Sequence, residues 1–414
     1  MGQSSYSRRA FFRFTGLSAA SLALARRARA QPDGPPSSFE VSASLYAWEL
    51  HDEGVEKILD NLQEMAAVNS VYLIALMHYE KRPLTSDVFP HNPVRKTWQA
   101  EDSRVYWHPD PTRYGRIKPR LSDYDWLNRT DWLRVLTEAA RKRGLKTGVE
   151  ISHTVLDAER GKGEFSDCVQ RNIHGQPRVI WGRSFPVCLN NPDVRRYVLS
   201  LFSELTARYD VDYLQTCMLP FMPGDAAAAG CFCEACLRAA KQVNLDLEKI
   251  KSILRGNPQA QPEFDNWQAF RCESVAGFYR TMHDGVHAIR PPIDLRFNDC
   301  FRSPRDWGFE LRPLKPYFDS VRVCDYSEQT GKLAALDGKR QWLKEVRLAL
   351  GEDKPLLSAV AVRPKATPEI IRQGVRTALD CGVNGITLGH YDGAEYPMLR
   401  AVGESLKAVN LGPT

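Results

Sequence analysis

Short apolar runs recur along the chain, and most of them are nearly continuous rather than alternating with polar residues. Such runs are typical of parallel strands that are covered on both faces. Eight of them predict strands, at residues 41–48, 71–78, 146–152, 211–217, 294–299, 320–325, 356–362 and 383–389.

Apolar residues recur at helical spacing between these strands, at 55–65, 132–139, 194–205 and 370–378. Eight strands alternating with helices predict an α/β fold of the (β/α)8 type, a TIM barrel, rather than an open doubly wound sheet. No G-x-G-x-x-G follows a predicted strand, which counts against a dinucleotide-binding fold.

Two connections, residues 79–128 and 218–264, are much longer than plain turns. They follow the second and fourth predicted strands, at the carboxyl-terminal face where barrel active sites are built. Connections of this length are usually functional. The first is rich in aromatic residues, which could stack on sugar rings or pack together as a lid. We predict one barrel domain over residues 41–410, with an insertion at about 218–264.

The first 30 residues resemble a twin-arginine signal peptide. Ser7-Arg8-Arg9-Ala10-Phe11-Phe12-Arg13 is similar to the export motif, an apolar run follows at 14–25, and Ala28-Arg29-Ala30 provides a cleavage site. Residues 31–40 are expected to form a linker. The mature protein is therefore expected in the periplasm or outside the cell.

The basic charge of the chain comes from this segment. Residues 1–30 contain six arginines and no acidic residue, so the formal net charge of +6 falls to about zero without them. A nucleic-acid partner is therefore not expected. Beyond the N-terminus, no stretch is long and apolar enough to span a bilayer. The sequence does not predict an oligomeric state.

Four cysteines form a pattern typical of a metal site. Cys231, Cys233 and Cys236 have the spacing C-x-C-x-x-C, and Cys188 lies upstream. The two cysteines of a C-x-C pair make a poor mutual disulfide. Four thiolates at about 2.3 Å around one zinc ion would account for all four and form a closed, structural site. The alternative is a disulfide between Cys188 and one of the other three.

These residues also carry a family resemblance. The segment Cys188-Leu-Asn-Asn-Pro-Asp-Val-Arg-Arg-Tyr, then Ala207-Arg-Tyr, then the C-x-C-x-x-C loop resemble the zinc-cluster β-galactosidases of glycoside hydrolase family forty-two and related hypothetical glycosyl hydrolases. The resemblance covers about residues 180–240. It implies a barrel fold, a carbohydrate substrate and a zinc ion held by Cys188 and the three loop cysteines.

The catalytic acids of that family have no counterpart here. In the family they end strands four and seven. This chain has no carboxylate between Asp212 and Asp225, and none in residues 356–364. Other carboxylates would have to act in their place, or the chain is not a hydrolase.

Four acids near the ends of other strands are the candidates: Glu150, Asp299, Asp325 and Glu328. Glycoside hydrolysis requires two carboxyls that flank one bond, about 5–5.5 Å apart for retention and about 6.5–9.5 Å apart for inversion. Asp299 and Asp325 end neighbouring strands, and Glu150 lies across the mouth. We predict Asp325 and Glu150 as the first choice of catalytic pair. For each acid, a salt bridge or a helix cap is the structural alternative.

The predicted substrate-binding residues lie at strand ends or in the aromatic loop: His78, Trp107, His153, Tyr326, His390 and Asp392. Together these observations predict an exported glycoside hydrolase that acts on a carbohydrate. One alternative is a non-catalytic carbohydrate-binding barrel. Another is a metal-dependent sugar isomerase or lyase, in which His390 and Asp392 would bind a divalent metal with Glu150, His153 and Asp299.

Overall fold

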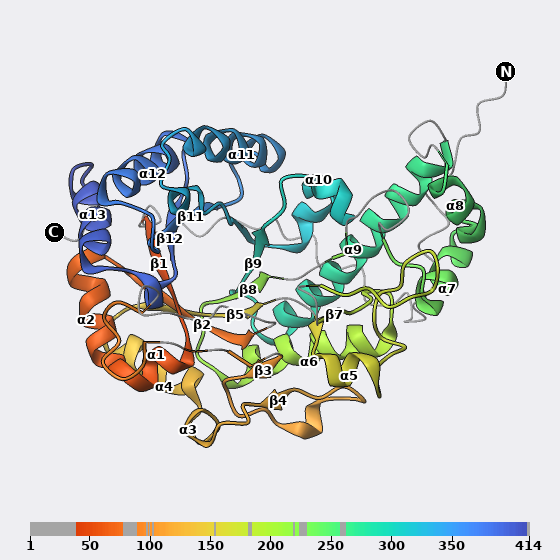
Figure 1. Cartoon of the computed structure of the whole chain (residues 1–414), viewed down its shortest axis with the longest axis horizontal. Coiled ribbons are helices and arrows are strands. Elements are labelled where there is room, and N and C mark those ends of the chain that lie inside the picture. Colours follow the sequence, from red (N-terminus) through yellow and green to blue (C-terminus); the bar gives the residue numbers. More distant parts are fainter. Residues whose placement is uncertain are drawn as a thin grey trace, which may run out of the picture.

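The computed structural model describes residues 39–77, 89–96, 98, 100–101, 103–152, 155–180, 184–217, 220–222, 230–256 and 262–411. Eight parallel strands close into a barrel, because β1 pairs with both β12 and β2 (Figure 1). Around the barrel these strands are β1 (Glu40–Leu45), β2 (Ser70–Met77), β5 (Lys146–Ser152), β8 (Tyr213–Cys217), β9 (Asp294–Asp299), β10 (Ser320–Val323), β11 (Leu356–Ala361) and β12 (Gly385–Gly389).

Helices surround the barrel, and short strands decorate its loops. The helices are α1 (Ala47–Glu53), α2 (Val55–Ala66), α3 (Asp125–Asn128), α4 (Trp132–Lys142), α5 (Ala158–Lys162), α6 (Pro192–Arg208), α7 (Glu234–Gln242), α8 (Leu247–Leu254), α9 (Pro262–Ile289), α10 (Leu311–Leu314), α11 (Ala335–Leu350), α12 (Pro368–Asp380) and α13 (Tyr396–Lys407). The additional strands are β3 (Arg104–Val105), β4 (Arg120–Leu121), β6 (Val155–Leu156) and β7 (Phe185–Pro186). In Figure 1, α7 and α8 lie at the right edge of the molecule, beyond the long helix α9.

The predicted (β/α)8 barrel is confirmed, and each predicted strand has a counterpart. One boundary is wrong by several residues, because β1 ends at Leu45 and residues 47–53 form α1. The Glu49 side chain accepts a hydrogen bond from the Tyr46 backbone N–H at 2.6 Å, which starts this helix immediately after the strand. The predicted export signal lies outside the described residues.

The loop after β2 packs on itself and on α1. Trp98 lies between Trp48 of α1 and Trp126, with ring centroids 6.3 Å and 5.2 Å away. Trp107 is 0% exposed. The aromatic residues described in this loop therefore form a packed cover beside β1 and β2.

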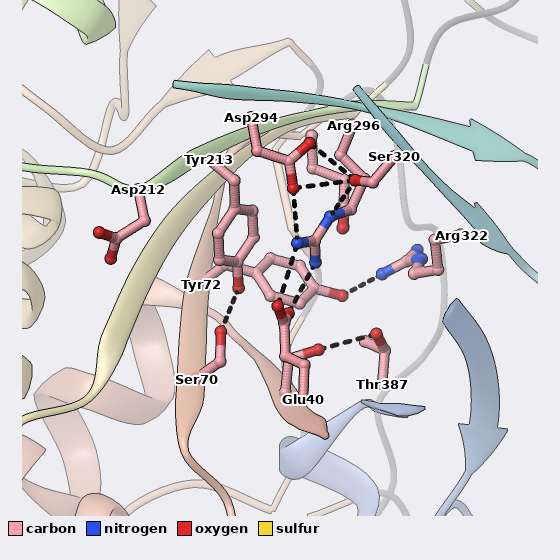
Figure 2. Close-up of polar contacts among 12 residues, drawn as sticks. Glu40, Ser70, Tyr72, Asp212, Tyr213, Asp294, Arg296, Ser320, Arg322 and Thr387 are labelled. Carbon is pink, nitrogen blue, oxygen red and sulfur yellow. Dashed lines mark hydrogen bonds and ion pairs between the residues drawn. The ribbon is translucent and has the colours of Figure 1, made fainter. Parts of the chain in front are cut away.

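The barrel interior contains charged residues as well as apolar ones. Near the amino ends of the strands, Arg296 donates to Glu40 at 2.8 and 3.2 Å and pairs with Asp294 at 2.9 Å (Figure 2). Its guanidinium also lies 4.0 Å from the ring centroid of Tyr213. This buried cation is therefore neutralised by two carboxylates at the end of the barrel opposite the predicted site.

Candidate functional site

Glu150 lies inside the barrel, near the carboxyl ends of the strands. The next inward position before it on β5 is Gly148, where a Cβ would lie 2.1 Å from the Tyr213 ring, so only glycine leaves room for that ring. Glu150 is 3% exposed and accepts hydrogen bonds from the side chains of Gln215 and Asn298, the latter at 3.2 Å. Its carboxylate is thus held by amide donors from β8 and β9.

One cation faces this carboxylate. The Arg322 guanidinium lies 3.5 Å from Glu150 and donates to the hydroxyl of Tyr72. Burial raises the pKa of Glu150, and it outweighs the opposing effect of Arg322. A buried carboxyl with a raised pKa keeps its proton to a higher pH than an ordinary glutamic acid, which is the property that a general acid requires.

The polar network around Glu150 and Arg322 continues across the mouth of the barrel to β12 and β1. Arg322 lies 3.5 Å from the Tyr326 hydroxyl, and the Tyr326 and His390 rings are 6.0 Å apart. His390 shares a hydrogen bond of 2.6 Å with Ser44 of β1. Two of the predicted substrate-binding residues, Tyr326 and His390, therefore lie beside the network of Glu150.

Asp299 points to the other side of its strand. Its neighbour Asn298 reaches Glu150 in the interior, and successive strand side chains face opposite ways. Asp299 accepts a hydrogen bond of 3.0 Å from the indole N–H of Trp342 on α11. Burial raises the pKa of Asp299 to about 7.

This pKa makes the stability of the protein depend on pH. Between about pH 4 and pH 7 the native state holds a proton on Asp299 that the unfolded chain has lost, so the free energy of unfolding falls as pH rises. At about 1.4 kcal/mol per pKa unit, the fall is on the order of 4 kcal/mol. We expect urea unfolding to detect this decline in the wild type relative to Asp299→Asn, with no further difference above about pH 8. Parallel curves for the two proteins would contradict it.

Asp325 faces an arginine near α11. Its carboxylate pairs with Arg302 and accepts a hydrogen bond of 2.8 Å from the Ser327 backbone N–H. The Arg302 guanidinium lies 5.3 Å from the ring centroid of Trp342. Asp299 and Asp325 are thus neighbours at the helix side of β9 and β10, as the sequence suggested, whereas Glu150 faces the barrel axis.

Glu328 forms a buried ion pair with Lys339 of α11, and both side chains are 0% exposed. Its second oxygen accepts a hydrogen bond of 3.0 Å from the Ala361 backbone N–H. Gly374 of α12 makes space for it, because a Cβ there would lie 2.3 Å from a Glu328 oxygen. These contacts join α11, α12 and β11, and they match the structural alternative for this acid.

Lys339→Met is expected to destabilise the protein by about 3–5 kcal/mol, because it leaves the Glu328 carboxylate buried without its cation. Urea unfolding measures the loss. The double variant Lys339→Met/Glu328→Leu should recover much of it, since an apolar pair can replace a buried ion pair. A Glu328→Gln protein of normal stability but without activity would instead assign a catalytic role to Glu328.

Asp392 lies at the end of β12 in a second group of buried acids. Its carboxylate is 3.6 Å from the Arg363 guanidinium. Burial and the nearby charge of Asp392 raise the pKa of Glu49 on α1 well above its usual range. Burial and the neighbouring acids therefore disfavour the charged form of Glu49.

The remaining predicted residues are divided between the core and the undescribed segments. Trp107 is wholly buried, so its ring has no exposed face with which to stack on a sugar. His78 and His153 lie outside the described residues. Within the described ranges, the groups of residues close enough to share a metal ion include neither His390 nor Asp392.

The four cysteines of the predicted cluster lie together in the core. Their four sulfur atoms all lie within 4.8 Å of one another, and no disulfide joins Cys188, Cys231, Cys233 or Cys236. The Cys188 and Cys236 sulfurs are 3.4 Å apart. Backbone Arg171 N–H and the Asn190 amide point at Cys231 and Cys236, at 3.4 and 3.5 Å. Hydrogen-bond donors of this kind orient and stabilise thiolates that bind a metal. The residues therefore fit a metal ion.

The fold is a (β/α)8 barrel similar to the barrels of several glycoside hydrolases. The glycoside hydrolase domain of PgaB (BpsB) from Bordetella bronchiseptica superposes with a TM-score of 0.64 at 14% identity, over 91% of this chain and 99% of that one. The α-L-fucosidase isoenzyme 2 of Paenibacillus thiaminolyticus gives 0.58 at 16% identity, over 90% and 49%. The β-galactosidase of the psychrophilic Marinomonas ef1 gives 0.56 at 11% identity, over 90% and 60%.

These likenesses concern the fold. The chain spans about half the length of the fucosidase. No protein-family model matches the sequence, and no curated protein matches it.

Proposed function

We propose that this protein is a glycoside hydrolase that cleaves a carbohydrate substrate in the carboxyl-terminal mouth of the barrel. The observation that carries the proposal is Glu150, a buried acid with a raised pKa beside Arg322 and two amide donors. A carboxyl in this state is suited to protonate a leaving glycosidic oxygen. The glycosidases with similar folds support the proposal.

The mechanism requires a second carboxylate, which attacks the anomeric carbon or activates a water molecule. The sequence predicts Asp325 as this partner of Glu150. Because Asp325 lies on the helix side of β10, its side chain would have to turn toward the barrel axis to take this role. Arg302, which pairs with Asp325, is 53% exposed, so its side chain has room to turn aside for a substrate. Tyr326 and His390 are proposed to bind sugar hydroxyls, because they lie beside Glu150 and present hydrogen-bonding groups at the mouth.

A panel of aryl glycosides and oligosaccharides tests the proposal, with Asp325→Asn assayed beside the wild type. We expect hydrolysis by the wild type and a loss of turnover in the variant. If Asp325 is the nucleophile, added azide should restore product release with an azide adduct. An active Asp325→Asn protein would transfer the second role to another acid, with Asp392 as the next variant to make.

A non-catalytic carbohydrate-binding barrel is the second candidate. The observation that favours it is the end of β8, where Gln215 and Cys217 stand on a strand that carries a catalytic acid in the family the sequence resembles. Binding of a sugar ligand without turnover of any glycoside, unchanged in Glu150→Gln, would support this candidate.

We further propose that the cysteine cluster binds a structural zinc ion and that the protein is exported by the twin-arginine route. Four sulfur ligands leave no open position on zinc, so the ion would take no part in the reaction. The twin-arginine route transports folded cargo, which allows the metal to be bound before export.

A further inference from the structure

A second group of metal-ligating side chains lies at the other end of the barrel. His283 and His287 stand four residues apart near the end of α9, and Asp319 immediately precedes β10. One ligand atom from each lies within 4.8 Å of the others. Their half-buried side chains are 25%, 18% and 36% exposed, so an ion could reach them from solvent.

Helical geometry explains why the two rings meet. Residues i and i+4 occupy the same face of a helix, and the His283 and His287 ring centroids are 4.3 Å apart. Asp319 completes the group from the amino end of a barrel strand. The three residues therefore connect the end of the longest helix to the start of β10.

The Nδ1 hydrogen bond of His287 matches that of a metal ligand. Its Nδ1 is 2.9 Å from the Pro291 carbonyl oxygen, which can only accept, so Nδ1 carries a hydrogen. Its Nε2 points at Asp319 Oδ2, 2.9 Å away. Metal-binding histidines usually donate their other ring N–H to such an acceptor, which fixes the tautomer and the ring orientation. The Asp319 carboxylate can also only accept, so Nε2 donates to it, and a bound ion would take the place of that hydrogen.

Asp319 is held by the barrel as well as by His287. Its Oδ2 accepts a hydrogen bond of 2.9 Å from the Leu295 backbone N–H on β9. The carboxylate is thus oriented in part by the barrel backbone. A tetrahedral zinc ion places neighbouring ligands roughly 3.3 Å apart, so the His287–Asp319 pair would open only slightly to admit it.

We propose that His283, His287 and Asp319 form a binding site for a divalent transition-metal ion such as Zn²⁺, separate from the cysteine cluster. Two imidazoles and one carboxylate suit zinc, with water as the fourth ligand. The ion fastens α9 to the start of β10. Its effect is on stability, because the site lies at the opposite end of the barrel from Glu150.

Zinc titration by calorimetry tests the site in protein whose cysteine cluster is already loaded and from which excess metal has been removed. We expect the wild type to bind one further equivalent. His283→Gln and His287→Gln should bind it more than tenfold more weakly, since the loss of even a second-shell contact costs about 10–100-fold. His174→Gln is the control, because His174 is an exposed histidine elsewhere.

Unfolding gives a second measurement. Zinc at about 100 times its dissociation constant should favour the folded wild type about 100-fold, and this gain should disappear in the variants. If a variant fails to fold, electron paramagnetic resonance of Cu²⁺ bound to the wild type tests the site instead. We expect the spectrum to show coupling of the copper ion to two nitrogens. No further equivalent in the wild type, equal affinity in the variants or a spectrum without two nitrogens would overturn the proposal.

Discussion

Glu150→Gln should lower kcat/KM for glycoside hydrolysis by about 10²–10⁴-fold, which is the usual contribution of a general acid. The amide has nearly the same shape as the carboxyl, but it cannot donate a proton to the leaving oxygen. The loss should be smallest for substrates with acidic leaving groups such as nitrophenol, because these depart with little assistance. Initial rates on aryl glycosides of graded leaving-group pKa measure both effects.

The pH profile separates this role from a structural one. Because the pKa of Glu150 is raised, the wild type should keep its proton, and its activity, to a higher pH than an ordinary glutamic acid would allow. The decline at higher pH should be absent from the residual activity of Glu150→Gln. A variant with the same profile as the wild type would remove Glu150 from the mechanism.

Two controls accompany this prediction. Glu150→Gln removes the carboxyl that faces buried Arg322, so the variant must be shown to be folded at the assay temperature. Asp299→Asn is the matched variant, because it makes the same acid-to-amide change in the barrel wall but faces Trp342 on the helix side. It should keep most of the activity. Equal losses in both variants would indicate damage to the barrel rather than to its chemistry.

The barrel could be predicted from the sequence because each strand and helix has its own local pattern of apolar residues. The apolar runs identified the eight strands, since most residues that face the helices are apolar whatever the interior contains. The apolar runs did not show, however, which charged residues lie inside the barrel. Arg296 and Arg322 lie within two of them, and both side chains are buried in the barrel with acidic partners. A single cation in an apolar run does not reveal that its partner lies on a strand far away in sequence.

The candidate site could be predicted only in part for the same reason. A strand-end acid can face either the axis or the helices, and a shift of one residue changes the face. Asn298 reaches Glu150, whereas adjacent Asp299 contacts Trp342. Glu328 is committed to Lys339, eleven residues further on. His283 and His287 have an H-x-x-x-H spacing, but they were not among the predicted metal ligands. What could not be seen was that Asp319 would meet them.

Removal of the proposed zinc ion should have the largest effect on stability. Cys188→Ser removes the one ligand that lies before α6, whereas the other three belong to a single segment, residues 231–236, which leads into the first turn of α7. The free energy of metal binding contributes directly to folding, and structural zinc sites bind with about 10–16 kcal/mol in small domains. Even a fraction of this value should lower the melting temperature of Cys188→Ser by about 10 °C or more.

Metal analysis and thiol counting decide what holds the cluster together. The wild type should contain about one zinc ion per chain, and Cys188→Ser should contain much less. Cys381→Ser is the control, because Cys381 is a half-buried cysteine outside the cluster. Alkylation of unfolded, metal-free wild type should modify all four cluster thiols. A protected pair that includes Cys188 would establish the disulfide alternative.

Kinetics complete the prediction, because a closed site of four sulfur ligands has no position for substrate. Below its melting temperature, Cys188→Ser should therefore turn over glycosides with a kcat close to that of the wild type. The cluster does touch the surroundings of the mouth, since Gln170 joins Pro220, shortly after β8, to Val187, the neighbour of Cys188. A rise in KM without a fall in kcat would show that the metal positions this loop for substrate. A matching loss of kcat would place the metal in the chemistry instead.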